Sequence, residues 1–168
     1  PTNSPQPLPK TNYIVHQNNL ASITLGELPL DEISLVELVD ICSKGMVEGV
    51  QLSDYLRQNN QHPMAERKPI LLLGELANPY QLARLKLGAI PVFTVRISDI
   101  CRTYADSLDN RMINPGIHHI TIARTQGWWE TTHLAFATLP QIKQMIDWLS
   151  NNRKGDWRPI KLACFRII

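Results

Sequence analysis

Two histidines and two threonines in the last third of the chain are spaced so that a tight turn can bring them together. His119 and Thr121 precede the stretch Thr-Gln-Gly at 125–127, and Thr131 and His133 follow it. A three-residue loop with glycine in the left-handed position is a common hairpin connection. Counting outward from such a loop pairs His119 with His133 and Thr121 with Thr131, with Cβ atoms about 5 Å apart. The sequence therefore predicts a hairpin that carries a His–His pair beside a Thr–Thr pair.

Paired imidazoles with hydroxyl groups can bind a phosphate or act as acid and base near neutral pH. These four residues are therefore the candidate catalytic residues of a small phosphoesterase or metal-assisted hydrolase. The order His119-x-Thr121 resembles one half of the motif of the 2H phosphoesterases, which carry two His-x-Ser/Thr elements on separate strands. Here the second copy is reversed, as Thr131-x-His133.

No metal and no cofactor are expected. A closed zinc site needs four ligands, and the hairpin offers two histidines. The structural alternative for the same residues is the solvated face of an ordinary sheet. The opposite face of the predicted hairpin has the composition of a core: Ile120, Ile122, Leu134 and Phe136.

Basic and tryptophan side chains alternate through the C-terminal part of the chain, in the hairpin and in the polar loop after the last helix. The candidate binding residues are Arg124, Trp128, Trp129, Arg153, Lys154, Trp157 and Arg158. Arginine and lysine neutralise phosphates, and exposed aromatic rings stack on bases, which is what single-stranded nucleic acid requires. Exposed tryptophans serve protein interfaces equally well. The simplest alternative is core tryptophan with scattered solvated bases.

The charge is unevenly divided although the net charge is only +2. Residues 1–54 carry two lysines against seven acidic side chains, a balance of −5, and residues 55–168 carry 15 basic and 8 acidic side chains, a balance of +7. Such asymmetry indicates either a basic binding surface with an acidic lobe or a folded dipole without a partner.

Helix signals are clear at three places. The capping pairs are Ser34 with Glu37, Asn78 with Pro79, and Thr138 with Gln141. Each precedes apolar residues at helical spacing. A shorter helix is expected near Ser53, and another after Ser98. Short strands are expected at 13–16 and 22–25.

The stretch 67–96 contains two continuous apolar strands, 69–73 and 91–95, on either side of the Asn78 helix. This pattern predicts a right-handed βαβ crossover with parallel strands. Gly74, Glu75 and the run GAIPVFTVR resemble part of the ParB-type nucleotide-binding domain, but Leu76 and Ala77 stand where that family has arginines. No family is assigned on this resemblance.

The length of 168 residues suits one domain with a hydrophobic core. The sequence predicts a flexible proline-rich arm at 1–10 and a single α/β (α+β) domain at 11–168. That domain has a mixed sheet of about five strands, built from the βαβ unit and a C-terminal hairpin, helix and strand.

The three cysteines, Cys42, Cys101 and Cys164, show no metal-binding spacing and are expected to be reduced thiols in a cytoplasmic protein. No apolar run is long enough to span a membrane. The leading hypothesis is a non-catalytic cytoplasmic binding module that contacts nucleic acid, or a protein that handles it, through its C-terminal half. The hydrolase and a protein-interaction subunit remain the alternatives.

Overall fold

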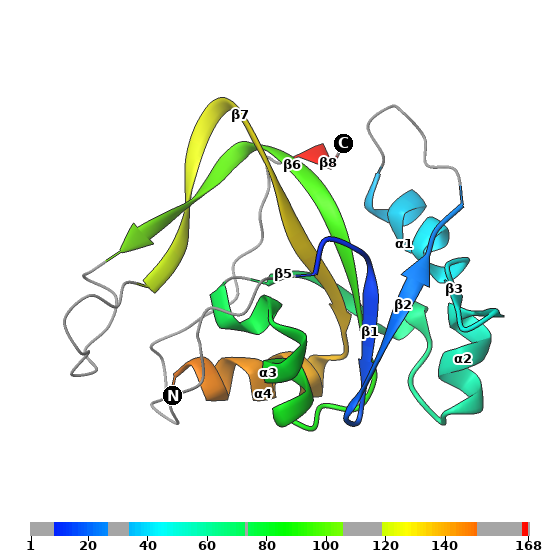
Figure 1. The fold of residues 1–168 in the computed structure, drawn as a ribbon. Helices are drawn as coiled ribbons and strands as arrows, with labels where there is room; N and C mark the ends of the chain where they lie inside the picture. The colour runs from blue at the N-terminus through cyan, green and yellow to red at the C-terminus, as the bar shows by residue number, and fades with distance from the viewer. Residues whose placement is uncertain (1–8, 27–33, 73, 106–118, 151–165, 168) are drawn as a thin grey trace.

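The computed structural model describes residues 9–26, 34–72, 74–105, 119–150 and 166–167 (Figure 1). Its strands are β1 (Tyr13–His16), β2 (Asn19–Thr24), β3 (Met46–Val47), β4 (Val50–Gln51), β5 (Lys68–Leu72), β6 (Ile90–Ala105), β7 (His119–Ala137) and β8 (Arg166–Ile167). Its helices are α1 (Leu35–Ser43), α2 (Leu52–Gln58), α3 (Pro79–Arg84) and α4 (Leu139–Leu149), with short 3₁₀ turns η1 (Met64–Glu66) and η2 (Gly74–Ala77). The predicted α+β class is confirmed.

The strands of the described residues form one antiparallel sheet in the order β4-β3-β2-β1-β6-β7-β5, with β8 also paired to β6. The prediction of about five strands is a rough match only, and the sheet is antiparallel where a mixed sheet was predicted. The predicted βαβ unit is present as β5, α3 and β6, but its two strands are not neighbours. The strands β5 and β6 do run in the same direction, because each is antiparallel to β7, but β7 lies between them. Their continuous apolar sequences indicate burial on both faces, which does not identify the neighbouring strand.

The predicted hairpin is also wrong. The 19 residues of β7 form a single strand that pairs along its length with the 16 residues of β6. The helix expected after Ser98 is part of β6, since pairing with β7 satisfies the backbone groups of that segment. In Figure 1 the two strands rise from the body, curve over, and extend beyond the rest of the sheet as a two-stranded ribbon.

A bulge interrupts this ribbon. Ser98 pairs with Trp129 and Ile100 pairs with Arg124, so Asp99 alone lies opposite residues 125–128. Gly127 has φ +77°, the left-handed conformation that the sequence predicts there, although it serves a bulge rather than a hairpin turn. Asp99 is also left-handed, with φ +64°, and its Oδ1 accepts a 2.9 Å hydrogen bond from the N–H of Gly127.

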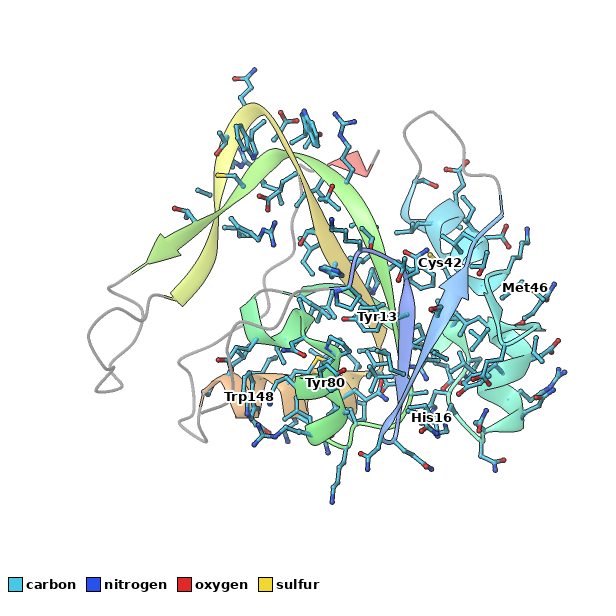
Figure 2. All side chains as sticks on the ribbon, viewed as in Figure 1. Tyr13, His16, Cys42, Met46, Tyr80 and Trp148 are labelled. Atoms are coloured by element: carbon cyan, nitrogen blue, oxygen red, sulfur yellow. The ribbon has the colours of Figure 1, made fainter. Side chains whose placement is uncertain are left out.

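The two faces of the sheet carry separate cores. On one face, α1 and α2 pack residues such as Cys42 and Leu56 against Phe93 and Phe136. On the other, α3 and α4 pack Leu82 and Met145 against side chains that include Tyr13, Val92 and Ala135. Figure 2 labels Cys42 on α1 and Tyr13 on β1, one from each core. Alternation along β6 and β7 therefore fixes which side chains share the α3/α4 face.

The helix starts agree with the sequence. Both capping boxes form, at Ser34 with Glu37 and at Thr138 with Gln141. The side chain of Asn78 accepts a 3.0 Å hydrogen bond from the N–H of Tyr80, with Pro79 in the first turn. These signals act within a single turn of chain, which is why sequence alone can locate them.

Candidate functional site: tryptophans and arginines on the β6–β7 ribbon

Two adjacent tryptophans lie at the bulge of the ribbon. Trp128 and Trp129 are each 53% exposed. Such exposure is unusual for tryptophan, which is highly buried on average in folded proteins. The hydrogen bond from Gly127 to Asp99 fixes the backbone immediately before them. In Figure 2 the side chains at this part of the ribbon stand clear of the helices, unlike the labelled Tyr13 and Cys42. The pair therefore presents apolar ring surface to solvent on a defined backbone.

Arg96 orients one of these rings. Its guanidinium carbon lies 3.8 Å from the centroid of the Trp129 ring, a cation–π contact. Register explains the contact: Arg96 is opposite Thr131 and Trp129 is opposite Ser98, so the two side chains are diagonal neighbours on one face. At an exposed position such a contact contributes about 0.5–1 kcal/mol, enough to restrict the indole to a few orientations.

A second arginine braces the ribbon on its other face. Arg102 Nε donates a 2.9 Å hydrogen bond to Glu130 Oε1, and Arg102 Nη2 donates to the carbonyl of Thr131. The backbone N–H of Arg102 also donates to Glu130 Oε1. This ion pair spans the bulge and holds the two strands in register. The charge of Arg102 is therefore already compensated within the ribbon.

Among the described ribbon residues, Arg96 and Arg124 are the arginines without an acidic partner. Both are exposed, and neither forms an ion pair with another residue in the described ranges. We call Arg96, Arg124, Trp128 and Trp129 the Trp–Arg platform. Three of its members, Arg124, Trp128 and Trp129, are predicted binding residues. The other four, Arg153, Lys154, Trp157 and Arg158, lie outside the described residues.

The candidate catalytic residues are not brought together. His119 and His133 lie fourteen positions apart on the same strand, a separation on the order of 40 Å. Thr121 is paired with Thr103, and Thr131 with Arg96. The predicted register fails because the Thr-Gln-Gly signal belongs to a bulge, so both arms of the supposed hairpin pair with β6 instead of with each other.

His133 is a core residue in this fold. It is 6% exposed, its ring lies 6.2 Å from that of Tyr13, and its Nε2 is 2.9 Å from the carbonyl oxygen of Pro9. Within the described part of the chain, no three His, Cys, Asp or Glu side chains gather as a metal site would require. Cys42 and Cys101 are free thiols, and Cys164 lies outside the described residues.

The sequence analysis missed the polar side of β6. Thr94, Arg96 and Ser98 alternate with buried Phe93, Val95 and Ile97. This period of two is the signal that was available, and it continues through the residues predicted to be helical. Together with Thr131 and His133 on β7, these residues form a row on the α3/α4 face.

Comparison with known proteins adds no assignment, since the sequence matches no protein-family profile, no curated protein and no solved structure. Among the described helices, none combines the length and the apolar character that crossing a bilayer requires. The functional argument therefore depends on the geometry of the ribbon.

Proposed function

We propose that the protein is a non-catalytic binding module that contacts single-stranded nucleic acid through the Trp–Arg platform. One observation carries the proposal: two adjacent indoles, each 53% exposed, lie on a projecting ribbon beside arginines without an acidic partner in the described residues. Stacking of a base on an aromatic side chain is worth about 1–3 kcal/mol. That gain accounts for exposing side chains that would otherwise be buried.

The charges at the platform suit the same ligand. Arg96 is held over one face of the Trp129 ring, so that it can contact a phosphate of a strand whose base stacks on the other face of the indole. Arg124 lies on the other face of the ribbon, since its partner Ile100 packs in the α1/α2 core, so a strand reaches it by crossing the ribbon at the bulge. Compensation of Arg102 by Glu130 leaves two free arginines among the described ribbon residues, so stacking supplies much of the affinity and phosphate contacts the remainder.

A protein partner is the second candidate, because a specific feature of the ribbon favours it. In the described residues, β6 from Ile100 to Ala105 pairs only with β7, and β7 pairs with β5 only from His133 onward. The ribbon thus has strand edges to which an extended peptide can add. The hydrolase alternative has lost the histidine pair on which it depended.

Oligonucleotide binding tests the proposal. We expect the fluorescence anisotropy of a labelled single-stranded oligonucleotide to increase when the full chain is added. Binding should weaken as the salt concentration rises. Trp129→Ala should weaken binding at least tenfold, because stacking on the indole is lost. Arg124→Ala should lower the slope of log affinity against log salt concentration by about 1, the value expected for one lost phosphate contact.

Arg57→Ala is the matched control, since Arg57 is exposed on α2, which lies away from the projecting ribbon (Figure 1). It should leave both affinity and salt dependence unchanged. Absence of binding at low salt would reject the nucleic-acid function. Equal losses for Arg124→Ala and Arg57→Ala would place the contact away from the platform.

A further inference from the structure

A row of polar side chains leads from the Trp–Arg platform toward the body of the protein. Thr94 is opposite His133, Arg96 is opposite Thr131, and Ser98 is opposite Trp129. All lie on the α3/α4 face, two residues or about 7 Å apart along each strand. The row contains no carboxylate.

Three atoms of this row are buried without a hydrogen-bond partner: Thr94 Oγ1, Ser98 Oγ and His133 Nδ1. Buried polar groups in native proteins are nearly always paired, and an isolated one marks a water, an ion or a ligand group. Thr94 and His133 are cross-strand neighbours with Cβ atoms about 5 Å apart, so one external group can reach both.

The contacts of His133 restrict what that group is. The carbonyl of Pro9 can only accept a hydrogen bond, so the hydrogen lies on Nε2, and in the neutral ring Nδ1 is an acceptor. The missing partner must therefore donate to His133 Nδ1 while it exchanges a hydrogen bond with the hydroxyl of Thr94. A fully ionised phosphate has only acceptors and does not meet this requirement. A hydroxyl group does, and so does a water molecule that a ligand hydroxyl would displace.

We propose that Thr94 and His133 bind a ribose 2′-hydroxyl, so that the platform prefers RNA to DNA. This inference rests on the proposed function. The order of groups along the row suits a nucleotide strand: hydroxyl contacts at Thr94 and His133, a guanidinium at Arg96 for the phosphate, and the ring of Trp129 for a base. The 2′-hydroxyl is both donor and acceptor and is the group that distinguishes the two nucleic acids.

Access to this pair involves the N-terminal segment. His133 is 6% exposed, and the carbonyl of Pro9 lies against it. Among the described residues, this is the one side-chain hydrogen bond that joins Pro9–Thr11 to the sheet. The next residue, Asn12, is anchored, because its Oδ1 accepts a 2.8 Å hydrogen bond from the N–H of Thr94. The sugar reaches His133 when Pro9–Thr11 shifts and the hydrogen bond between Pro9 and His133 breaks.

The test compares three labelled oligonucleotides of one sequence: ribose, deoxyribose and 2′-O-methyl. We expect the full chain to bind the ribose form roughly fivefold to tenfold more tightly than the deoxyribose form, as one net hydrogen bond allows. The 2′-O-methyl form keeps the acceptor but lacks the donor that His133 Nδ1 needs, and it should bind no better than deoxyribose.

Variants assign the preference to the row. Thr94→Val should remove the preference while deoxyribose binding persists, and Thr94→Ser should retain it because the hydroxyl remains. Thr132→Val is the matched control, since Thr132 is buried on the other face of β7. Equal affinity for ribose and deoxyribose forms, or a preference that survives in Thr94→Val, would overturn this inference alone. Failure of all three oligonucleotides to bind would reject the proposed function as well.

Discussion

At the scale of single residues, the ribbon depends on Asp99 and Gly127, the two left-handed residues at its bulge. An added Cβ on Gly127 would meet no atom within 4 Å, so its constraint lies in the backbone angle and not in packing. Asp99 combines a left-handed angle with the hydrogen bond to Gly127. Both residues act on Trp128 and Trp129 only by fixing the path of the strand before them.

Substitution of Asp99 separates these two effects. Asp99→Gly loses the hydrogen bond but suits the left-handed angle, whereas Asp99→Ala loses the bond and is strained. We expect Asp99→Ala to lower the free energy of unfolding by about 1 kcal/mol more than Asp99→Gly. Urea denaturation followed by circular dichroism measures the difference. Asp99→Asn, which keeps the acceptor, should stay close to the parent, and equal stability of the Ala and Gly variants would argue against strain at this position.

Arg67 is a second residue with a large local effect. It is 3% exposed, and it donates hydrogen bonds to the carbonyls of His62, Ala89 and Phe136. No acidic side chain in the described residues pairs with it, and burial lowers its pKa to about 10. The guanidinium thus joins the start of β6 to the end of β7 through backbone oxygens.

Replacement of Arg67 should therefore be costly. Arg67→Met removes the guanidinium donor from three carbonyls, of which that of Ala89 keeps only a 3.4 Å hydrogen bond from Gln141, and we expect the free energy of unfolding to fall by about 3 kcal/mol. Lys68→Met changes the exposed next residue, the first of β5, and should cost less than about 0.5 kcal/mol. Chemical denaturation of both variants measures the contrast. A loss for Arg67→Met as small as that for Lys68→Met would mean that water replaces the guanidinium.

At the scale of secondary-structure elements, sequence located the helices better than it located the strand partners. The caps at Ser34, Asn78 and Thr138 involve groups within three residues, and all of them form. Strand pairing depends on distant segments. The left-handed glycine at 127 fits either a hairpin turn or a bulge. It lies in a bulge because the long β6 strand pairs with the residues on both sides of it.

Dependence on strand pairing also limited what the sequence could predict about the candidate site. The exposed tryptophans and Arg124 were predictable from residue type, because solvent exposure of this chemistry is typical of binding surfaces. The contribution of Arg96, Thr94 and Ser98 was not predicted, since their position beside Trp129 and His133 follows from the register of β6 against β7. The histidine pair failed for the same reason.

At the scale of the whole molecule, acidic side chains of the N-terminal part lie on the elements that cover one face of the sheet. In the described part of the first 54 residues, the acidic side chains Glu37, Asp40, Glu48 and Asp54 lie in α1, in α2 and near the short β3–β4 pair. These elements cover the face opposite α3 and α4 (Figure 1). A polyanion is therefore expected to approach from the side of the polar row.

Global stability should fall at alkaline pH, and the sign follows from a buried thiol. Burial raises the pKa of Cys42 to about 12, whereas in the unfolded chain it is near 8.5. Above about pH 8.5 the unfolded state releases this proton and the folded state keeps it, so unfolding becomes easier as pH rises.

We expect the free energy of unfolding to fall by about 1–2 kcal/mol between pH 8.5 and 10 through this group. Cys42→Val should flatten the pH dependence over this interval, whatever its effect on stability at neutral pH. Urea denaturation of both proteins at several pH values measures the slopes. Identical slopes would show that Cys42 is not protected from ionisation in the folded state. Tyr13 adds to the decline at higher pH, because burial also raises its pKa.

The central claim is that bases stack on Trp128 and Trp129, and intrinsic tryptophan fluorescence tests it most directly. Titration with an unlabelled single-stranded oligonucleotide should quench the emission of the full chain. Trp128→Phe/Trp129→Phe should abolish most of this quenching, whereas Trp148→Phe, a change on α4 (Figure 2), should leave it intact. Binding without quenching, or quenching that persists in the double variant, would contradict stacking at the ribbon.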